Sequence, residues 1–260
     1  MSLNLKMIQV NIWKGKFLDA LVDFLRKENP DIITMQEVTA GEENSCADKT
    51  LDLFIYLRDA LSLSGVVVRT FGFHGDTYAY HGSAIFVKGD IVSQKEVWLR
   101  PYTELPQTYE DNPVSWPLLS RSLLDATICI QNKTMHIISV HGAWNKEPVD
   151  TVENVRQAEL IAAHIRTLRG EPFLLGGDLN MTPETQVIRT IDAVAQNAMK
   201  NLGMKSTLHP TIHKTAKEKP DGLLVDYIYT SPHFTVEKMS VPIVAVSDHL
   251  PVVGVLQYTK

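Results

Sequence analysis

Two polar residues, Asp178 and Asn180, have the types and the spacing of a catalytic pair. They follow an apolar run, residues 173–175, and two glycines, Gly176 and Gly177, that allow the backbone to turn sharply. Alternate residues of an extended chain lie on the same side, so both polar side chains could face one pocket at the end of a buried strand. The ordinary alternative is an Asx-type turn, in which the two side chains bond nearby backbone amides.

The same pattern recurs along the chain, with polar side chains at or next to the ends of apolar, strand-like runs. These residues are Asn11, Glu37, His141, Asp178, Asn180, Asp226 and the adjacent Asp248 and His249. If two sheets pack face to face, these ends can converge. Four of the side chains are carboxylates, which would repel one another strongly without a cation. Hard oxygen ligands favour Mg²⁺, or Mn²⁺, over zinc, so the residues predict a magnesium-type site.

Hydrophobic periodicity predicts the elements that position these side chains. Residues 5–13 alternate as a strand, apolar residues from 17 to 25 recur at helical spacing, and residues 31–36 form a second strand that delivers Glu37. Further strands are expected over residues 66–70, 82–88, 91–99, 118–130, 134–140, 223–230, 234–239 and 252–258. Further helices are expected over residues 51–65, between 150 and 170, and from Pro183, with Thr182 as its cap.

Composition predicts a globular chain with a sizeable core. Of 260 residues, 44% are hydrophobic, and no repeat, low-complexity tract or linker divides the sequence. Strand groups with interspersed helices predict an α/β fold (α+β in the broad sense) with two packed sheets covered by helices. We therefore expect a single domain over residues 1–260.

Charge and cysteine content give no support to a duplex-binding protein or to a disulfide-stabilised one. Asp and Glu (30) outnumber Lys and Arg (25), for a net charge of −5, whereas proteins that bind a nucleic-acid duplex usually carry a basic excess. Cys46 and Cys129 do not form a disulfide framework, because one lies in a polar loop and the other in an apolar run. With neither a leader sequence nor an apolar run long enough to cross a bilayer, we expect a cytoplasmic protein.

Six motifs in one order carry a family resemblance. They are Asn11, Gln36-Glu37-Val38, His141, Gly177-Asp178-Leu179-Asn180, Val225-Asp226-Tyr227-Ile228 and Ser247-Asp248-His249. This order resembles the endonuclease/exonuclease/phosphatase superfamily, which includes deoxyribonuclease, exonuclease III, inositol-polyphosphate phosphatase and neutral sphingomyelinase members. The resemblance spans residues 5 to 258. It implies a four-layered α/β/β/α sandwich, with two mixed sheets flanked by helices.

The resemblance also implies roles at the metal and at the attacking water. Glu37 would bind the divalent metal directly, with Asn11 and Asp248 completing or supporting its shell. Asp178 would orient and deprotonate the water, as a general base within hydrogen-bond reach. Asn180 would hold that water or a phosphate oxygen.

Four further roles around the phosphate follow from the same resemblance. His249 would stabilise charge on the phosphoryl oxygens, and Asp226 would accept its other N–H and fix its tautomer. His141 would donate to the phosphate in the transition state. It stands where abasic-site endonucleases tend to carry Tyr, which points to the deoxyribonuclease, sphingomyelinase or phosphatase branches. Arg121 occupies a strand position where several members carry an active-site Arg.

Each of these residues also has an ordinary interpretation as a strand end, a solvated edge, a turn or an ion pair. The remaining histidines have no comparable placement, and we expect them to be structural or exposed. They are His74, His81, His136, His164, His209, His213 and His233.

Substrate choice should depend on the loops around the site. Loop 40–50 is acidic, loop 100–117 combines acidic residues with aromatic ones, and loop 205–219 is basic, although we interpret it as solvated. We expect a hydrolase of small or modest phosphomonoesters or phosphodiesters. A DNA or RNA nuclease, a sphingomyelinase-like lipid phosphodiesterase and a non-catalytic binding protein are the alternatives. We also expect a monomer without stable membrane association.

Overall fold

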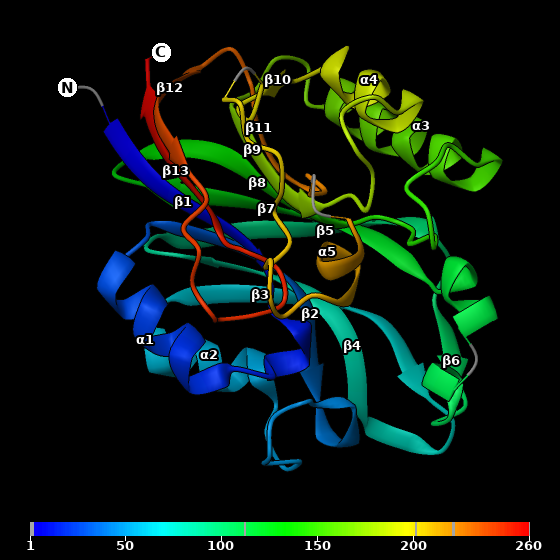
Figure 1. The fold of residues 1–260 in the computed structure, drawn as a ribbon. Helices are drawn as coiled ribbons and strands as arrows, with labels where there is room; N and C mark the ends of the chain where they lie inside the picture. Colours follow the sequence, from blue (N-terminus) through cyan, green and yellow to red (C-terminus); the bar gives the residue numbers. More distant parts are fainter. Residues whose placement is uncertain (1–2, 112, 201, 220–221, 260) are drawn as a thin grey trace.

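Two mixed β-sheets stacked face to face form the centre of the molecule (Figure 1). The structure, a computed structural model, describes residues 3–111, 113–200, 202–219 and 222–259. The first sheet has the strand order β12 (Phe234–Ser240), β13 (Val252–Tyr258), β1 (Leu3–Asn11), β2 (Ile32–Ala40), β4 (Asp76–Val87), β3 (Ser64–Phe73), β6 (Thr103–Leu105). The second has the order β10 (Gln196–Asn197), β11 (Asp226–Thr230), β9 (Phe173–Asp178), β8 (Lys133–His141), β7 (Arg121–Ile130), β5 (Asp90–Arg100).

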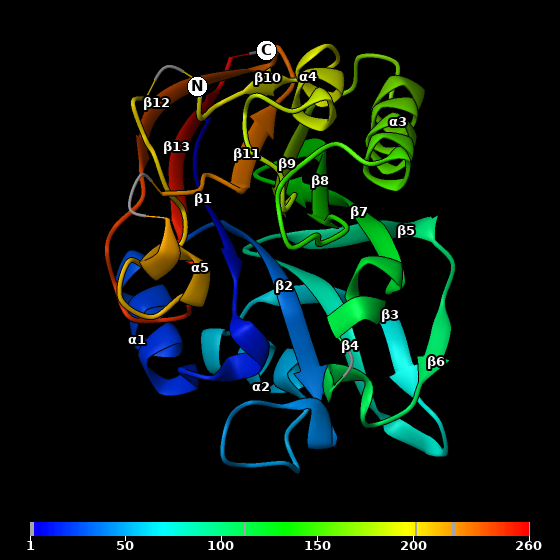
Figure 2. The same ribbon diagram turned by 45° about the vertical axis from the view of Figure 1, so that its right-hand side comes forward.

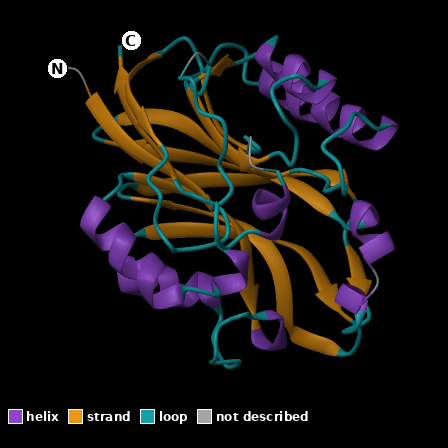
Figure 3. Ribbon diagram, viewed as in Figure 1, coloured by secondary structure: helices purple, strands orange, loops and turns teal. Residues whose placement is uncertain are grey.

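Helices cover the outer face of each sheet, which confirms the predicted four-layered sandwich (Figures 2 and 3). The first sheet is covered by α1 (Leu18–Glu28) and α2 (Leu53–Leu61), and the second by α3 (Val152–Thr167) and α4 (Gln186–Asp192). Short helices lie in the connections: α5 (Lys214–Glu218), η1 (Trp13–Gly15), η2 (Gly41–Glu43), η3 (Tyr109–Asp111) and η4 (Pro113–Leu118).

Alternation along β1 separates the two cores. Leu5 and Met7 belong to the apolar cluster shared with the second sheet, whereas Ile8 and Val10 pack with α1 and α2. By the same alternation, Asn11 lies on the side of β1 that faces the second sheet. β1 pairs in parallel with β2, and β8 in parallel with β9, so these strands end at a common edge. This edge of the two sheets is called the rim below.

The structure corrects several predicted boundaries. β1 ends at Asn11 rather than at residue 13, and β4 begins six residues before the strand predicted over 82–88. α4 begins at Gln186 with Thr185 as its cap, because the Thr185 hydroxyl accepts from the backbone N–H of Ile188. Loops 100–117 and 205–219 are not entirely irregular, since the first contains β6 and the second α5. Both cysteines are free, as expected.

Gly176 on β9 allows close approach between the sheets. A Cβ at this position would lie 2.1 Å from the Thr34 hydroxyl oxygen and 2.8 Å from the Met7 methyl carbon, both in the opposite sheet. No side chain larger than hydrogen fits there without movement. The glycine therefore serves packing between sheets.

We expect Gly176→Ala to lower the free energy of unfolding by about 1–3 kcal/mol, the usual cost of overpacking a core. Chemical denaturation with matched m-values is the measurement. Ser93→Ala, at an exposed position of the edge strand β5, is the control and should change stability by at most about 0.5 kcal/mol. Equal stability of the two variants would contradict the close approach of the sheets.

A buried carboxylate joins α3 to the second sheet. Asp125 of β7 contacts His136 Nδ1 at 2.9 Å and His164 Nε2 of α3 at 2.8 Å. Burial alone would raise the pKa of Asp125, but hydrogen bonds from the two histidines outweigh it and hold the pKa below its usual value. The bond to Asp125 is also the main cause that raises the pKa of His136.

This pairing predicts a pH-dependent contribution to stability. Because the pKa of His136 is higher in the folded than in the unfolded chain, its contribution is complete below about pH 6.5 and is lost as the pH rises through the folded pKa. The difference in unfolding free energy between the wild type and His136→Gln should therefore be larger at acidic than at alkaline pH. The exposed His74→Gln serves as control, and its difference should stay flat.

Candidate active site

Strand ends bring four of the predicted residues to the rim, and a bulge inside β2 brings a fifth, Glu37, which the sequence had placed after the end of its strand. Asn11, His141 and Asp178 are the last residues of β1, β8 and β9, and Asp226 is the first of β11. His141 is opposite Asp178 in the parallel pair of β8 and β9. Asp226 is opposite Asp178 in the antiparallel pair of β11 and β9. Glu37 lies at a bulge in β2 with a positive φ of 59°, which displaces its side chain from the regular alternation.

Asn11 connects the two sheets at the rim. It is 2% exposed, and its amide nitrogen donates to Glu37 Oε1 and to Asp178 Oδ2, both at 3.1 Å. Its oxygen accepts from the backbone N–H of Trp13 at 3.0 Å, so the orientation of the amide is fixed. One carboxylate from each sheet is thus held by a single neutral donor.

Asp178 is at the centre of the cluster. It is 1% exposed, and its Oδ1 accepts from the backbone N–H of Asn180 at 2.9 Å. This is the contact expected of an Asx-type turn, the ordinary alternative for this pair of residues. Asn180 itself has a φ of 55° and donates its side-chain N–H to the Gly142 carbonyl at 3.2 Å. Burial, helped by the charge of Asp226, raises the pKa of Asp178 to about 7 against the opposing effect of His249. The Asx-type turn therefore coexists with a cluster of polar side chains around Asp178.

His249 forms a pair with Asp226 at one side of Asp178. Its Nδ1 lies 2.9 Å from Asp226 Oδ2, and its Nε2 lies 3.8 Å from Asp178 Oδ2. Burial alone would lower the pKa of His249, but the charges of Asp226 and Asp178 raise it well above the usual value. Asp226 is fully buried, and the Thr207 hydroxyl accepts from its backbone N–H at 3.1 Å.

His141 and Arg121 lie at the other side. His141 Nε2 is 3.7 Å from Asp178 Oδ2, and burial together with the Arg121 charge lowers the pKa of His141 well below its usual value. The buried Arg121 donates to the carbonyls of Gly142 at 2.9 Å and Ser120 at 3.1 Å. Among the described residues Arg121 has no ion-pair partner within 4 Å, so the alternative of a simple ion pair with an acidic neighbour does not describe it.

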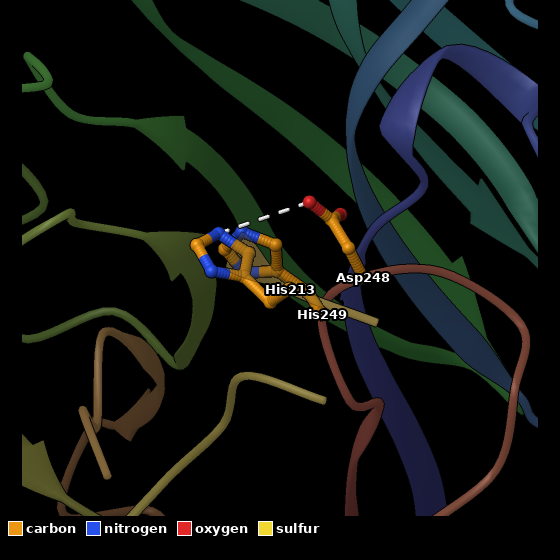
Figure 4. Close-up of side chains that lie close together, drawn as sticks. All are labelled: His213, Asp248 and His249. Atoms are coloured by element: carbon orange, nitrogen blue, oxygen red, sulfur yellow. Dashed lines mark ion pairs between the residues drawn. The ribbon is translucent and has the colours of Figure 1, made fainter. Parts of the chain in front are cut away.

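Asp248 meets a histidine that the sequence had not indicated. Figure 4 shows His213, Asp248 and His249 converging, with His213 Nε2 3.7 Å from Asp248 Oδ2. One ligand atom from each of the three lies within 4.8 Å of the others. Burial, with the nearby Glu37 charge, raises the pKa of Asp248 to about 6, and burial lowers that of His213 to about 4.

The interpretation of residues 205–219 as a solvated loop is wrong for its first half. The backbone N–H of His209 donates to the Asp248 carbonyl at 2.8 Å, and that of Leu250 to the Thr207 carbonyl at 2.6 Å. These bonds fix the loop beside the last motif. His213 could not be placed from sequence because its approach to Asp248 depends on this non-local pairing.

A hydrogen-bond network of buried amides beneath the rim was also not predicted, although one member, Gln36, lies in a quoted motif. Gln9 donates to Asp226 Oδ1 at 3.4 Å and also contacts Gln36, which donates to the Ser139 hydroxyl at 3.2 Å in the opposite sheet. Thr34 donates to Gln9 at 2.7 Å. A signal for Gln9 exists in the sequence, because it lies two residues before Asn11 and therefore on the same side of the strand.

The donor set around Glu37 and Asp248 fits a divalent cation. Both side chains end in carboxylate oxygens, and the Glu37 charge contributes to the raised pKa of Asp248. A cation between the two would remove this repulsion. Asn11 is hydrogen-bonded to Glu37 through its amide N–H.

Comparison with known proteins identifies the family. The model of the Endonuclease/Exonuclease/phosphatase family matches residues 1–249. The chain belongs to this family. It is accordingly a phosphoester hydrolase, as its motifs predicted. Comparison with curated proteins finds no significant match.

Solved structures of the family share the fold across nearly the whole chain. An endonuclease/exonuclease/phosphatase from Bacteroides vulgatus has a TM-score of 0.72 at 20% identity, covering 98% of this chain and 99% of its own. A mannosyl-6-phosphatase from Bacteroides thetaiotaomicron has a TM-score of 0.69 at 17% identity, covering 97% and 99%. The human Nocturnin catalytic domain, with bound sulfate, has a TM-score of 0.69 at 17% identity, covering 98% and 94%. Within the described part of this chain, no helix is long and apolar enough to cross a membrane.

Proposed function

We propose that this family member is a divalent-metal-dependent hydrolase of a small or modest phosphomonoester or phosphodiester, acting by in-line attack of an activated water. The arrangement around Asp178 carries the proposal. Its Oδ2 atom lies 3.1 Å from the Asn11 amide, 3.7 Å from His141 Nε2 and 3.8 Å from His249 Nε2. A buried base flanked by two imidazoles and an amide suits in-line displacement at phosphorus, which needs an oriented water and neutralisation of charge.

Asp178 would take the proton from the attacking water. A pKa raised to about 7 suits a base that works near neutral pH, because it accepts a proton readily yet is ionised in a large fraction of molecules. Asn180, whose backbone N–H already orients the carboxylate, would hold the water through its side-chain oxygen. Both residues thus set the direction of attack.

Three cationic or polar groups would hold the phosphate. His249, kept in one tautomer by Asp226, would present Nε2–H to a phosphoryl oxygen. Arg121, buried and anchored on the Gly142 carbonyl, would supply positive charge, and His141 would donate as a neutral imidazole.

Glu37 and Asp248 would hold the metal ion, with Asn11 supporting Glu37. Members of the family generally depend on a divalent metal, and Mg²⁺ or Mn²⁺ suits these oxygen donors. When bound, the ion neutralises charge on the phosphoryl group and polarises it toward attack.

The surroundings of the site favour a small substrate over a nucleic acid. The chain carries a net charge of −5, and two aromatic side chains of loop 100–117 serve the fold. Tyr109 packs in a buried cluster with Phe71, and Trp116 packs against Trp144 with ring centroids 5.2 Å apart. The buried Tyr109 ring is therefore not free to stack on a base, which is the usual device of single-strand binding.

A substrate panel tests the proposal. Purified protein is assayed with p-nitrophenyl phosphate, bis-p-nitrophenyl phosphate, a set of phosphorylated metabolites and supercoiled plasmid, each with Mg²⁺, Mn²⁺ or EDTA. We expect metal-dependent turnover of one or more small esters at a rate well above plasmid nicking. Plasmid nicking as the dominant activity would support a nuclease, and binding without any turnover would overturn the enzyme assignment.

Asp178→Asn should leave the fold intact and lower kcat by about 10²–10⁴-fold, because the base is lost while shape is kept. Steady-state kinetics on the best small ester, with thermal unfolding as the check on folding, is the measurement. Asp192→Asn, a partly buried carboxylate on α4, is the matched control and should retain activity. Unchanged kcat in Asp178→Asn would remove this residue from the mechanism.

Glu37→Gln should weaken metal binding, so the Mg²⁺ concentration that gives half-maximal rate should rise by about tenfold or more, with partial recovery at high Mg²⁺. Equilibrium dialysis of Mn²⁺ gives a readout that does not depend on turnover. Glu42→Gln, an exposed carboxylate in the neighbouring η2, is the control. A metal response identical to that of the wild type would show that Glu37 is not a ligand.

A further inference from the structure

Polar contacts, rather than apolar packing, bring His213 to the rim. None of the residues of α5, the helix that follows it, is buried. The backbone N–H of His213 donates to the His209 carbonyl at 3.1 Å, and the backbone N–H of His209 donates to the Asp248 carbonyl at 2.8 Å. At the far end of α5, Lys219 forms an ion pair with Glu147. The segment is therefore tied to the last motif and delivers one imidazole ring beside Asp248.

The contacts of this ring determine which nitrogen carries its proton. His213 is the N-cap of α5, and its Nδ1 accepts from the backbone N–H of Thr215 at 3.1 Å. A ring nitrogen that accepts a hydrogen bond carries no proton, so the proton of the neutral ring is on Nε2. Burial, together with the charge of His249, lowers the pKa of His213 to about 4, so the ring is neutral at pH 7. His213 thus presents an uncharged N–H donor at Nε2.

This donor faces the carboxylate of Asp248. Its Nε2 lies 3.7 Å from Asp248 Oδ2, as the dashed line in Figure 4 shows, and a shift of about 0.7 Å would form a hydrogen bond. The other oxygen, Oδ1, accepts from the Ser247 hydroxyl at 3.3 Å. A carboxylate has about four lone-pair sites, so both oxygens can be held by a donor and still bind a cation.

The same geometry argues against His213 as a ligand of the metal itself. A metal on Nε2 would need the lone pair of that nitrogen, and the ring proton would then move to Nδ1. There it would point at the backbone N–H of Thr215 and break the cap of α5. An uncharged N–H donor, in contrast, can hold the carboxylate without placing a positive charge beside a bound cation.

We propose that His213 is a positioning residue of the metal site, whose Nε2–H holds Asp248 Oδ2 and turns the carboxylate toward a divalent cation. Carboxylates that bind metals are commonly oriented by such donors, and loss of one typically lowers metal affinity or activity by about 10–100-fold. The inference rests on the proposed function, in which Glu37 and Asp248 hold the ion.

Two substitutions separate the donor from the helix cap. His213→Asn keeps an acceptor for the Thr215 N–H, because Asn is among the best N-cap residues, but it is too short to replace Nε2–H. His213→Gln keeps an N–H donor at about the reach of Nε2 but is a poorer cap. In equilibrium dialysis, His213→Asn should bind Mn²⁺ about tenfold or more weakly than the wild type, and His213→Gln should lie between the two.

A residue that only caps α5 would give the reverse order, with His213→Gln the weaker binder. That order, or an unchanged affinity in His213→Asn, overturns the proposal. His209→Asn is the matched control, because His209 Nδ1 also accepts from the backbone N–H two residues on, that of Thr211 at 3.3 Å, and burial alone lowers its pKa. Its Mn²⁺ affinity should stay close to that of the wild type, and a loss equal to that of His213→Asn would assign the effect to the loop and overturn the proposal.

The tautomer of His213 gives a readout that depends on neither affinity nor turnover. In the ¹⁵N-labelled wild type, long-range ¹H–¹⁵N correlation spectra should show the proton on Nε2 both without and with Mg²⁺. Transfer of the proton to Nδ1 on adding Mg²⁺ would mean that the metal binds the ring directly, and would overturn the positioning role.

Asp248→Asn distinguishes a failure of this inference from a failure of the proposed function. If the wild type binds Mn²⁺ no more tightly than Asp248→Asn, the metal site of the proposed function is wrong, and the role of His213 falls with it. If Asp248→Asn alone weakens binding and His213→Asn does not, the metal site stands and only the role of His213 is wrong.

Discussion

The burial of the Asp178 carboxylate between two sheets is the constraint on which the active site depends. Removing a carboxylate from water is costly unless donors or opposite charge surround it. Asn11 supplies an N–H from the first sheet, Asn180 a backbone N–H, and His249 a positive charge. These partners come from both sheets, so the Asp178 charge is tolerated only when the sheets are stacked in this register. The chemistry of the rim therefore depends on the packing of the two sheets.

Small and amide side chains beneath the rim make this stacking possible. Gly176 lies two residues before Asp178. A Cβ added to it would come closer than van der Waals distance to Thr34 and Gln9 of the opposite sheet. Gln9 also reaches Asp226, the partner of His249. A buried polar network of this kind is stable only when every member is paired, so it specifies one relative position of the sheets.

Much of the fold and the site could be predicted because their signals are local. Alternation places Asn11 on the inner side of β1, and an apolar run followed by Asp178 marks a strand end. What was missed depends on contacts between distant segments: His213 meets Asp248 through a loop pairing, and His81 meets Glu43 across 38 residues. No periodicity encodes such contacts. The boundary error at α4 has a local cause, because Thr182 followed by Pro183 has the usual pattern of a helix start, whereas the hydroxyl that caps the helix is that of Thr185.

The histidines at the rim illustrate how one side-chain type acquires different properties from its neighbours. Carboxylates at both ring positions raise the pKa of His249, whereas burial near Arg121 lowers that of His141 and burial near His249 lowers that of His213. A charged imidazole can neutralise developing negative charge, while a neutral one can only orient through hydrogen bonds. The positions of Asp226 and Arg121, rather than the histidines themselves, therefore decide which of these rings holds charge. The substrate phosphate would meet a charged imidazole at one side of Asp178, and a neutral imidazole next to the Arg121 guanidinium at the other.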